Sequence, residues 1–198
     1  TIRLLHNIMG LWLVQECRRT WARSGQDVDY VELARMAEES PAFVALVNPS
    51  DPVFLAPGDM PARIREYCQR TGQPEPVGRG GMVRTALESL ALTYRRTLQQ
   101  LEEILGRKLE RIHIVGGGSQ NRVLNQLTAD ATGQPVVAGP VEATAAGNIL
   151  MQMLAMGHIG SLDEARALVR ASFAPEIFEP RSAEGWEAAY DRFLALPT

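Results

Sequence analysis

Three consecutive glycines, Gly116, Gly117 and Gly118, lie between an apolar stretch (residues 112–115) and a polar Ser-Gln-Asn sequence that ends at Asn121. Glycine has no Cβ atom, so its backbone can approach another group closely and adopt a positive φ without a steric penalty. In a turn from a strand into a helix, free N–H groups and the helix dipole usually face a phosphate or a ribose. We therefore predict that these four residues contact a ligand, and a tight turn that binds nothing is the alternative.

The glycine run matches neither of the two common nucleotide-binding motifs. A dinucleotide-binding G-x-G-x-x-G motif requires a small residue where Asn121 stands, and no Gly-Lys-Ser/Thr sequence follows as in a P-loop. A nucleotide would therefore have to bind these residues by a different scheme.

Two amides, Asn7 and Gln15, interrupt an apolar segment near the start of the chain. We expect a helix over residues 2–23, because its apolar residues recur at helical spacing. Eight residues are slightly more than two helical turns, so both amides would lie on nearly the same face. They could bind an adenine or ribose edge, or they could satisfy buried backbone groups, and the local pattern favours neither role.

The elements that would hold these residues in place form a helix-rich α/β domain with a small sheet. A strand, a helix, a strand and a helix follow one another from residue 112 onward, which predicts parallel strands joined by a crossover helix. The expected strands are 112–115 and 135–139, and the expected helices are 2–23, 30–39, 60–70, 83–105, 120–131, 142–156, 162–171 and one around 186–193. Residues 42–58 read as a loop with small strand pieces, and residues 71–81 as a linker.

The composition is that of a globular domain with a sizeable core: 198 residues, 45% hydrophobic, 22% charged, and a formal net charge of −3. This balance argues against a nucleic-acid surface, and no apolar run is long enough to span a membrane. Cys17 and Cys68 fall in expected helices without metal-type spacing, so we expect buried free thiols and a cytoplasmic location.

The sequence contains no poised general base, no nucleophile paired with a base and no metal cluster, so we predict no catalytic and no metal-binding residue in it. The chain also begins at Thr1, without an initiator methionine, and leads directly into an apolar pattern. We therefore expect that it is a piece of a longer protein.

Three segments resemble the C-terminal domain of the FGGY family of carbohydrate kinases. They are NIMGLWLVQECRRTW (7–21), VRTALESLALTYRRTL (83–98) and HIVGGGSQNRVLNQLTADATGQPVVAGPVEATAAGNILMQM (113–153). The resemblance implies an actin-like ATPase (ribonuclease H-like) domain, one of two that flank a cleft in these kinases. Residues 1–198 would be the C-terminal nucleotide-binding domain, and the N-terminal domain would lie upstream of them.

The resemblance also implies roles for matching positions. Gly117 resembles the glycine whose backbone meets the adenosine part of ATP, and Asn121 resembles an amide near the adenine. Asn7 and Gln15 resemble nucleotide-contacting positions of the first helix. The small residues 145–147 resemble the helix that connects the two domains, although core packing is the simpler explanation on the local pattern alone.

The activity that the resemblance implies is transfer of the γ-phosphoryl group of ATP, with Mg²⁺, to the 1-hydroxyl group of a ketose. The flanking segments are most similar to members that act on L-rhamnulose. In this family an aspartate general base, a phosphate-binding loop and most sugar contacts belong to the N-terminal domain, so the isolated chain should bind nucleotide weakly, if at all, and lack kinase activity. The alternative is a non-catalytic module of the same fold that binds a nucleotide or a partner protein.

Overall fold

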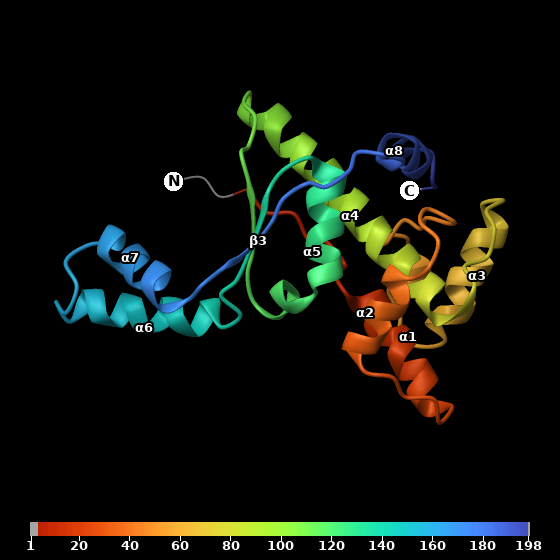
Figure 1. Cartoon of the computed structure of the whole chain (residues 1–198), viewed down its shortest axis with the longest axis horizontal. Coiled ribbons are helices and arrows are strands. Elements are labelled where there is room, and N and C mark those ends of the chain that lie inside the picture. Colours follow the sequence, from red (N-terminus) through yellow and green to blue (C-terminus); the bar gives the residue numbers. More distant parts are fainter. Residues whose placement is uncertain (1–3, 198) are drawn as a thin grey trace.

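The computed structural model describes residues 4–197, and it shows a helix-rich α/β structure with a three-stranded sheet (Figure 1). The helices are α1 (Trp12–Arg23), α2 (Tyr30–Glu38), α3 (Met60–Arg70), α4 (Gly78–Leu105), α5 (Arg122–Thr132), α6 (Ala143–Ala155), α7 (Leu162–Ser172) and α8 (Trp186–Leu194), with short 3-10 helices η1 (Pro52–Phe54) and η2 (Gly117–Gln120). The strands are β1 (Ile112–Ile114), β2 (Val136–Ala138) and β3 (Glu176–Phe178). The predicted combination of many helices and a small sheet is confirmed.

Side-chain caps and glycines set several helix ends where the sequence predicts them. The carboxylates of Asp29 and Asp59 each accept a hydrogen bond from the backbone N–H three residues later, at 2.8 and 3.0 Å, so α2 and α3 begin there. Gly106 and Gly133 end α4 and α5 in the left-handed conformation, with φ angles of 65° and 67°. These ends depend on contacts within a few residues, which is why the local pattern locates them.

The sheet has the order β1-β2-β3. Strands β1 and β2 run parallel, with Ile112 opposite Val136, and α5 forms the predicted crossover between them. Strand β3 pairs antiparallel with β2 and places Phe178 opposite Val136. We did not predict β3, because Pro175 and Pro180 on either side of it indicate a loop.

Helices α6 and α7 leave the sheet between β2 and β3 and form a hairpin that projects away from the rest of the molecule (Figure 1). None of the residues of α6 is buried, and Ile149 and Met151 are more than half exposed. Core packing therefore does not explain the small residues 145–147, and that expectation is wrong. No helix within residues 4–197 combines the length and the apolar composition needed to cross a membrane.

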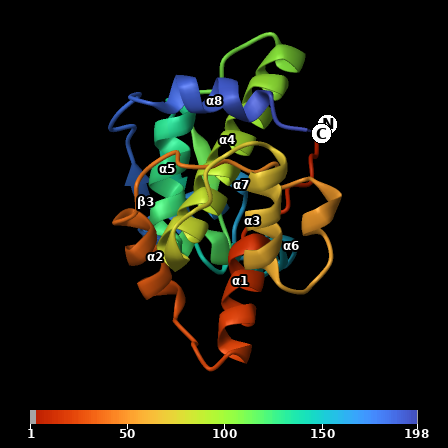
Figure 2. The same ribbon diagram turned by 90° about the vertical axis from the view of Figure 1, so that its right-hand side faces the viewer.

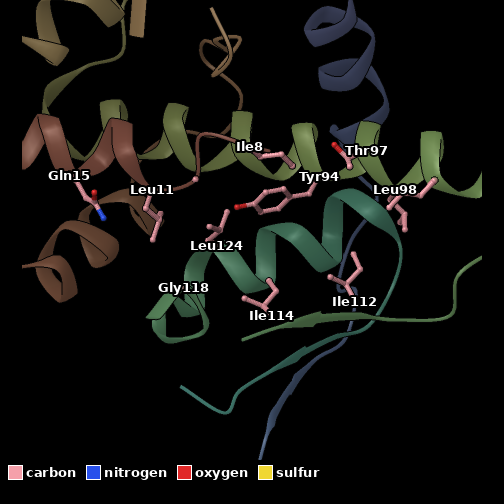
Figure 3. A pocket seen from close by; sticks show the side chains of 12 residues that line it. Ile8, Leu11, Gln15, Tyr94, Thr97, Leu98, Ile112, Ile114, Gly118 and Leu124 are labelled. Carbon is pink, nitrogen blue, oxygen red and sulfur yellow. The ribbon is translucent and has the colours of Figure 1, made fainter. Parts of the chain in front are cut away.

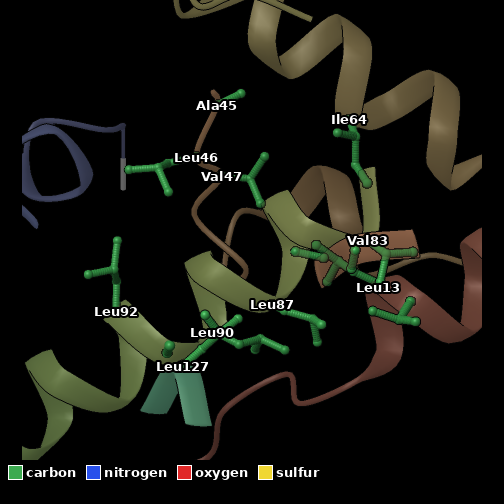
Figure 4. Close-up of a cluster of buried hydrophobic side chains, with 14 of the residues drawn as sticks. Leu13, Ala45, Leu46, Val47, Ile64, Val83, Leu87, Leu90, Leu92 and Leu127 are labelled. Carbon is green, nitrogen blue, oxygen red and sulfur yellow. The ribbon is translucent and has the colours of Figure 1, made fainter. Parts of the chain in front are cut away.

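The main core surrounds α4, where side chains from α1, α3, α5 and the segment around residue 46 meet (Figure 4). Leu87 and Leu90 of α4 are fully buried, and Leu13, Leu46 and Leu127 pack around them. Helix α8 closes the core beside α4 (Figure 2). Because α4 contacts most other helices, it fixes the position of α5 and of the turn that precedes α5.

Both cysteines are buried free thiols, as predicted. Burial raises the pKa of the Cys17 thiol, and it raises the pKa of Cys68 to about 11. Both thiols therefore stay protonated near neutral pH and pack as small apolar groups.

The first helix is shorter than predicted. It begins at Trp12, while residues 4–9 have no regular secondary structure and residues 2 and 3 lie outside the described part of the chain. Gly10 has a φ of 60° and makes a turn directly before α1. Leu4 and Leu5, which contribute to the helical pattern, are exposed, so their spacing does not reflect a buried helix face.

Residues 42–58 contain the 3-10 helix η1 and no strand, so the expected strand pieces are wrong. The backbone N–H groups of Leu46 and Val47 donate to the side chains of Gln73 and Ser89, at 2.9 Å each. Backbone N–H groups of this segment therefore donate to side chains of neighbouring elements and not to the backbone of another strand.

Helix α4 begins at Gly78, earlier than predicted, inside the stretch that was expected to be a linker. A Cβ atom at Gly80 would lie 2.4 Å from the carbonyl oxygen of Met36, so glycine allows α2 and α4 to approach backbone to backbone. Gly80 therefore serves close helix packing, which the sequence pattern alone does not distinguish from flexibility.

Candidate functional site

The glycine run forms the predicted turn between a strand and a helix, with the 3-10 helix η2 inserted before α5. Gly116 has φ 78° and ψ −166°, a conformation that is essentially restricted to glycine. The backbone N–H and the hydroxyl of Ser119 both donate to the carbonyl oxygen of Gly116, at 3.0 and 2.7 Å. Glycine is therefore required at the first position for the shape of the turn itself.

Gly117 and Gly118 have no such requirement. Neither has a positive φ, and a Cβ atom built on either would meet no atom of the described residues within 4 Å. Their N–H groups open η2 and have no hydrogen-bond acceptor within residues 4–197. A ligand that must contact the backbone closely would account for glycine at both positions.

The turn lies at the carboxyl end of the two parallel strands. Gly116 N donates to the carbonyl oxygen of Pro140 at 3.1 Å, and Gly139 N donates to that of Ile114 at 2.8 Å. The turn after β1 and the turn after β2 are thus side by side. In open α/β sheets, this edge is where ligands bind.

A pocket of about 490 Å³ opens beside the turn, between α4, β1, the start of α5 and the segment before α1 (Figure 3). Its lining is mostly apolar and consists of Ile8, Gly10, Leu11, Gln15, Tyr94, Thr97, Leu98, Leu101, Ile112, Ile114, Gly118 and Leu124. Figure 3 shows Gln15 and Gly118 at the end of the pocket away from Leu98. An apolar pocket with a few polar groups at one end suits a flat heterocycle with a polar edge.

Two of the predicted site residues, Gln15 and Gly118, therefore meet at one pocket. Asn7 does not line this pocket. It precedes the helix, in a segment without regular secondary structure, and its side chain is exposed. The expectation that Asn7 and Gln15 share a helix face is wrong, because the turn at Gly10 separates them. A nucleotide contact by Asn7 stays a prediction that no contact within the described residues supports.

Asn121 has a structural role that the sequence analysis did not assign. Its Oδ1 accepts a hydrogen bond from Leu124 N at 2.9 Å and caps the start of α5. Its backbone N–H donates to the carbonyl oxygen of Gly118 at 3.1 Å, which closes η2. The Nδ2 group has no acceptor within residues 4–197, so this half of the amide can still donate to a ligand.

Tyr94 is a polar group of the pocket that the sequence analysis missed, because its spacing in α4 marks it only as part of an apolar stripe. Its ring lies across the middle of the pocket in Figure 3. Burial raises the pKa of Tyr94, so the phenol stays protonated and neutral at physiological pH. The pocket therefore presents a neutral hydroxyl, an amide and backbone N–H groups, and these can bind a ligand but cannot act as a strong base.

Comparisons with known proteins identify the relatives of this chain. Residues 1–156 match the model of the FGGY family of carbohydrate kinases, C-terminal domain. The chain is 46% identical over 193 residues to a rhamnulokinase of Bacteroides thetaiotaomicron and 45% identical over 181 residues to one of Enterococcus faecalis. These alignments cover 98% and 90% of this chain but 39% and 36% of the relatives, so the chain spans less than two fifths of their length.

Solved structures share the fold at low sequence identity. A xylulose kinase from Rhodospirillum rubrum has a TM-score of 0.61 at 22% identity and matches 93% of this chain and 36% of its own. A Plasmodium falciparum glycerol kinase crystallised with ADP has a TM-score of 0.63 at 17% identity and matches 90% of this chain and 36% of its own. The fold is that of an actin-like ATPase domain, as the sequence resemblance predicts. Within that class, the chain belongs to the FGGY family of carbohydrate kinases.

Proposed function

We propose that this chain is the nucleotide-binding part of an ATP-dependent ketose kinase. The observation that carries the proposal is the pair Gly117 and Gly118. Their N–H groups have no acceptor within the described residues, and a Cβ atom at either position would meet no atom within 4 Å. Membership of the FGGY family of carbohydrate kinases supports phosphoryl transfer from ATP as the reaction of the whole protein.

In the proposed binding mode, the adenosine part of ATP lies against the glycine turn. The N–H groups of Gly117 and Gly118 donate to oxygens of the ribose or the adjacent phosphate. The apolar pocket beside Gly118 receives the adenine ring, and the amides of Gln15 and Asn121 contact its polar edge. Gly116 contributes by holding the turn in the conformation that presents these groups.

Phosphoryl transfer depends on positioning and on neutralisation of charge, and Mg²⁺ supplies part of that neutralisation in such reactions. Within residues 4–197, no group of three or more His, Cys, Asp or Glu side chains could hold a metal ion. That this chain supplies no metal ligand and no catalytic base stays a prediction from its sequence. Its residues bind and orient the nucleotide, and the isolated chain is expected to lack kinase activity.

We infer that the substrate of the whole protein is L-rhamnulose, phosphorylated at its 1-hydroxyl group. Two relatives named rhamnulokinase, at 46% and 45% identity, support this choice. The sugar is expected to bind mainly to the part of the protein outside this chain. The cytoplasmic location of the protein also stays a prediction. An assay of the intact protein with L-rhamnulose, L-fuculose and D-xylulose tests the choice, and a higher kcat/KM for either of the other two ketoses would contradict it.

The nucleotide site is tested by adding ATP or ADP to the isotopically labelled chain and following its amide resonances. The amides of Gly117, Gly118 and Asn121 are expected to shift, whereas that of Gly160, in the distant α6–α7 hairpin, serves as the reference. If a folded sample shows no shift at any of the three amides, this chain does not bind nucleotide at the glycine turn.

A further inference from the structure

Asn125 is a buried amide next to the glycine turn that the proposed nucleotide contacts do not involve. It lies on α5, one helical turn after Asn121, and is 0% exposed. Its Nδ2 donates to the carbonyl oxygen of Ser119 at 2.9 Å. This bond joins the body of α5 to the 3-10 helix that contains Gly117 and Gly118.

The other half of the same amide is unsatisfied. Asn125 Oδ1 is buried and has no hydrogen-bond partner within residues 4–197. A buried acceptor without a partner destabilises the folded state, and an apolar side chain would avoid that penalty. The bond from Nδ2 to Ser119 is therefore the interaction that accounts for an amide at this buried position.

The Ser119 carbonyl belongs to a residue that is hydrogen-bonded to the first glycine of the turn. Ser119 is itself buried, and both its N–H and its hydroxyl donate to the carbonyl oxygen of Gly116. Gly116 in turn donates to the carbonyl oxygen of Pro140 in the neighbouring turn. A continuous set of hydrogen bonds thus runs from Asn125 through Ser119 and Gly116 to the second turn.

We propose that Asn125 is a positioning residue of the nucleotide site. It holds the Ser119 carbonyl, so that the turn already has its binding conformation, with the N–H groups of Gly117 and Gly118 free of acceptors within the described residues, before a nucleotide arrives. A surface formed in advance binds more tightly, because less conformational freedom is lost on binding. This inference rests on the proposed nucleotide-binding function and adds to it a residue that touches neither ATP nor sugar.

The test compares the intact protein with its Asn125→Leu variant, which keeps the branching of the side chain at Cγ, adds some volume and removes the donor. The matched control is Thr128→Val, because Thr128 is also a fully buried polar residue of α5, but its hydroxyl donates to the carbonyl oxygen of Leu124 within the same helix. The first readout is hydrogen exchange of the ligand-free turn, followed at the Ser119 and Asn121 amides. The second readout is the separate determination of KM for ATP and kcat.

We expect exchange in the turn of Asn125→Leu to be faster, and KM for ATP to rise roughly five- to tenfold, the scale of one buried hydrogen bond. The kcat value should change less than about twofold, because the reacting groups at saturation are the same. Thr128→Val should match the unaltered protein in both readouts. Should Asn125→Leu fail to fold, Asn125→Ala provides the same comparison, since it removes the donor without adding volume.

A folded Asn125 variant with unaltered exchange or unaltered KM for ATP would overturn the positioning role. If the proposed function is wrong, the result is different, because the activity of the unaltered protein would then not depend on ATP at all. The nucleotide role of Asn125 would then be disproved as well. The exchange readout needs no nucleotide, so it still determines whether Asn125 orders the turn.

Discussion

The backbone N–H of Gly116 donates a hydrogen bond of 3.1 Å to the carbonyl oxygen of Pro140, and this bond joins the turns that follow β1 and β2. Because Gly139 N also donates to Ile114 O at 2.8 Å, the two turns are connected at two points. The glycine turn therefore belongs to the body of the sheet edge. A side chain added to its open side should leave the fold intact, whereas a change of backbone conformation at Gly116 should not.

A Gly117→Val substitution is expected to weaken ATP binding by roughly tenfold or more, because a branched side chain would occupy the space next to the N–H groups. Stability should change by less than about 1 kcal/mol, since Gly117 has no positive φ and a Cβ atom there meets nothing within 4 Å. Calorimetric titration with ATP and thermal unfolding measure the two effects. Gly160→Val is the control, because Gly160 also lacks a positive φ but lies in the distant α6–α7 hairpin; equal ATP affinity of both variants would contradict the assignment.

A Gly116→Ala substitution is expected to destabilise the protein by about 1–3 kcal/mol through backbone strain alone. A Cβ atom at Gly116 would meet no atom within 4 Å, so steric contact does not contribute. Gly133→Asn is the comparison, since Gly133 has φ 67° and ψ 16°, a left-handed conformation that asparagine tolerates. In urea unfolding, the free energy of unfolding of Gly116→Ala should be well below that of Gly133→Asn. The reverse order would show that the backbone of the turn can change conformation to accommodate alanine.

Two helix glycines should respond to alanine with opposite signs. At Gly80 the new Cβ would lie 2.4 Å from Met36 O, and such overpacking typically destabilises a protein by about 1–3 kcal/mol. At Gly147 of α6 the new Cβ meets nothing within 4 Å, so the higher helix propensity of alanine should stabilise the chain by up to about 1 kcal/mol. Urea unfolding of both variants measures these changes, and a stabilising Gly80→Ala would disprove the close approach of α2 and α4.

Glu88 should give the stability of the protein a distinct pH dependence. It is buried in α4, where its carboxylate accepts from Arg84 Nε at 2.7 Å and from Phe43 N at 2.9 Å. Burial raises the pKa of Glu88 above its ordinary value near 4.5 and outweighs the lowering by Arg84. The folded state therefore binds this proton more tightly than the unfolded state, so the contribution of Glu88 to stability is largest below 4.5 and decreases as pH rises through its folded pKa.

The Glu88→Gln variant isolates this effect. Its side chain does not titrate, so the free energy of unfolding of the unaltered protein minus that of the variant should fall as pH rises from about 4 to 7. Carboxylates whose pKa is lowered in the fold, such as Glu32 and Glu102, give the opposite slope but are present in both proteins and cancel. A difference that stays constant or grows with pH would rule out a raised pKa for Glu88.

Features that depend on neighbouring residues could be predicted. The caps of α2 and α3 at Asp29 and Asp59, the glycine ends of α4 and α5, and the parallel pairing of β1 with β2 all follow from local spacing, and the structure has them. The predicted start of α1 is too early because the apolar spacing continues through Leu4 and Leu5, although both side chains are exposed. Spacing describes which residues could share a face, and packing decides whether they do.

Strand β3 and the close packing at Gly80 could not be predicted, because each depends on a segment far away in the sequence. The role of Asn125 could not be predicted, because it depends on the burial of this residue in the packed structure. Strand β3 exists because β2 offers it backbone partners, although its own flanking prolines indicate a loop. Asn125 resembles any polar residue of an amphipathic helix until its burial and its bond to Ser119 are known.

Residue types and spacing were enough to predict the strand-glycine-helix order, the family resemblance and the residues at which a nucleotide is expected to bind. The packed fold was needed to show that Gly116 serves the backbone, that a side chain at Gly117 or Gly118 would meet open space, and that Gln15 but not Asn7 lines the pocket. Residue type and spacing specify local conformation, whereas open space, burial and long-range hydrogen bonds arise because distant segments pack together.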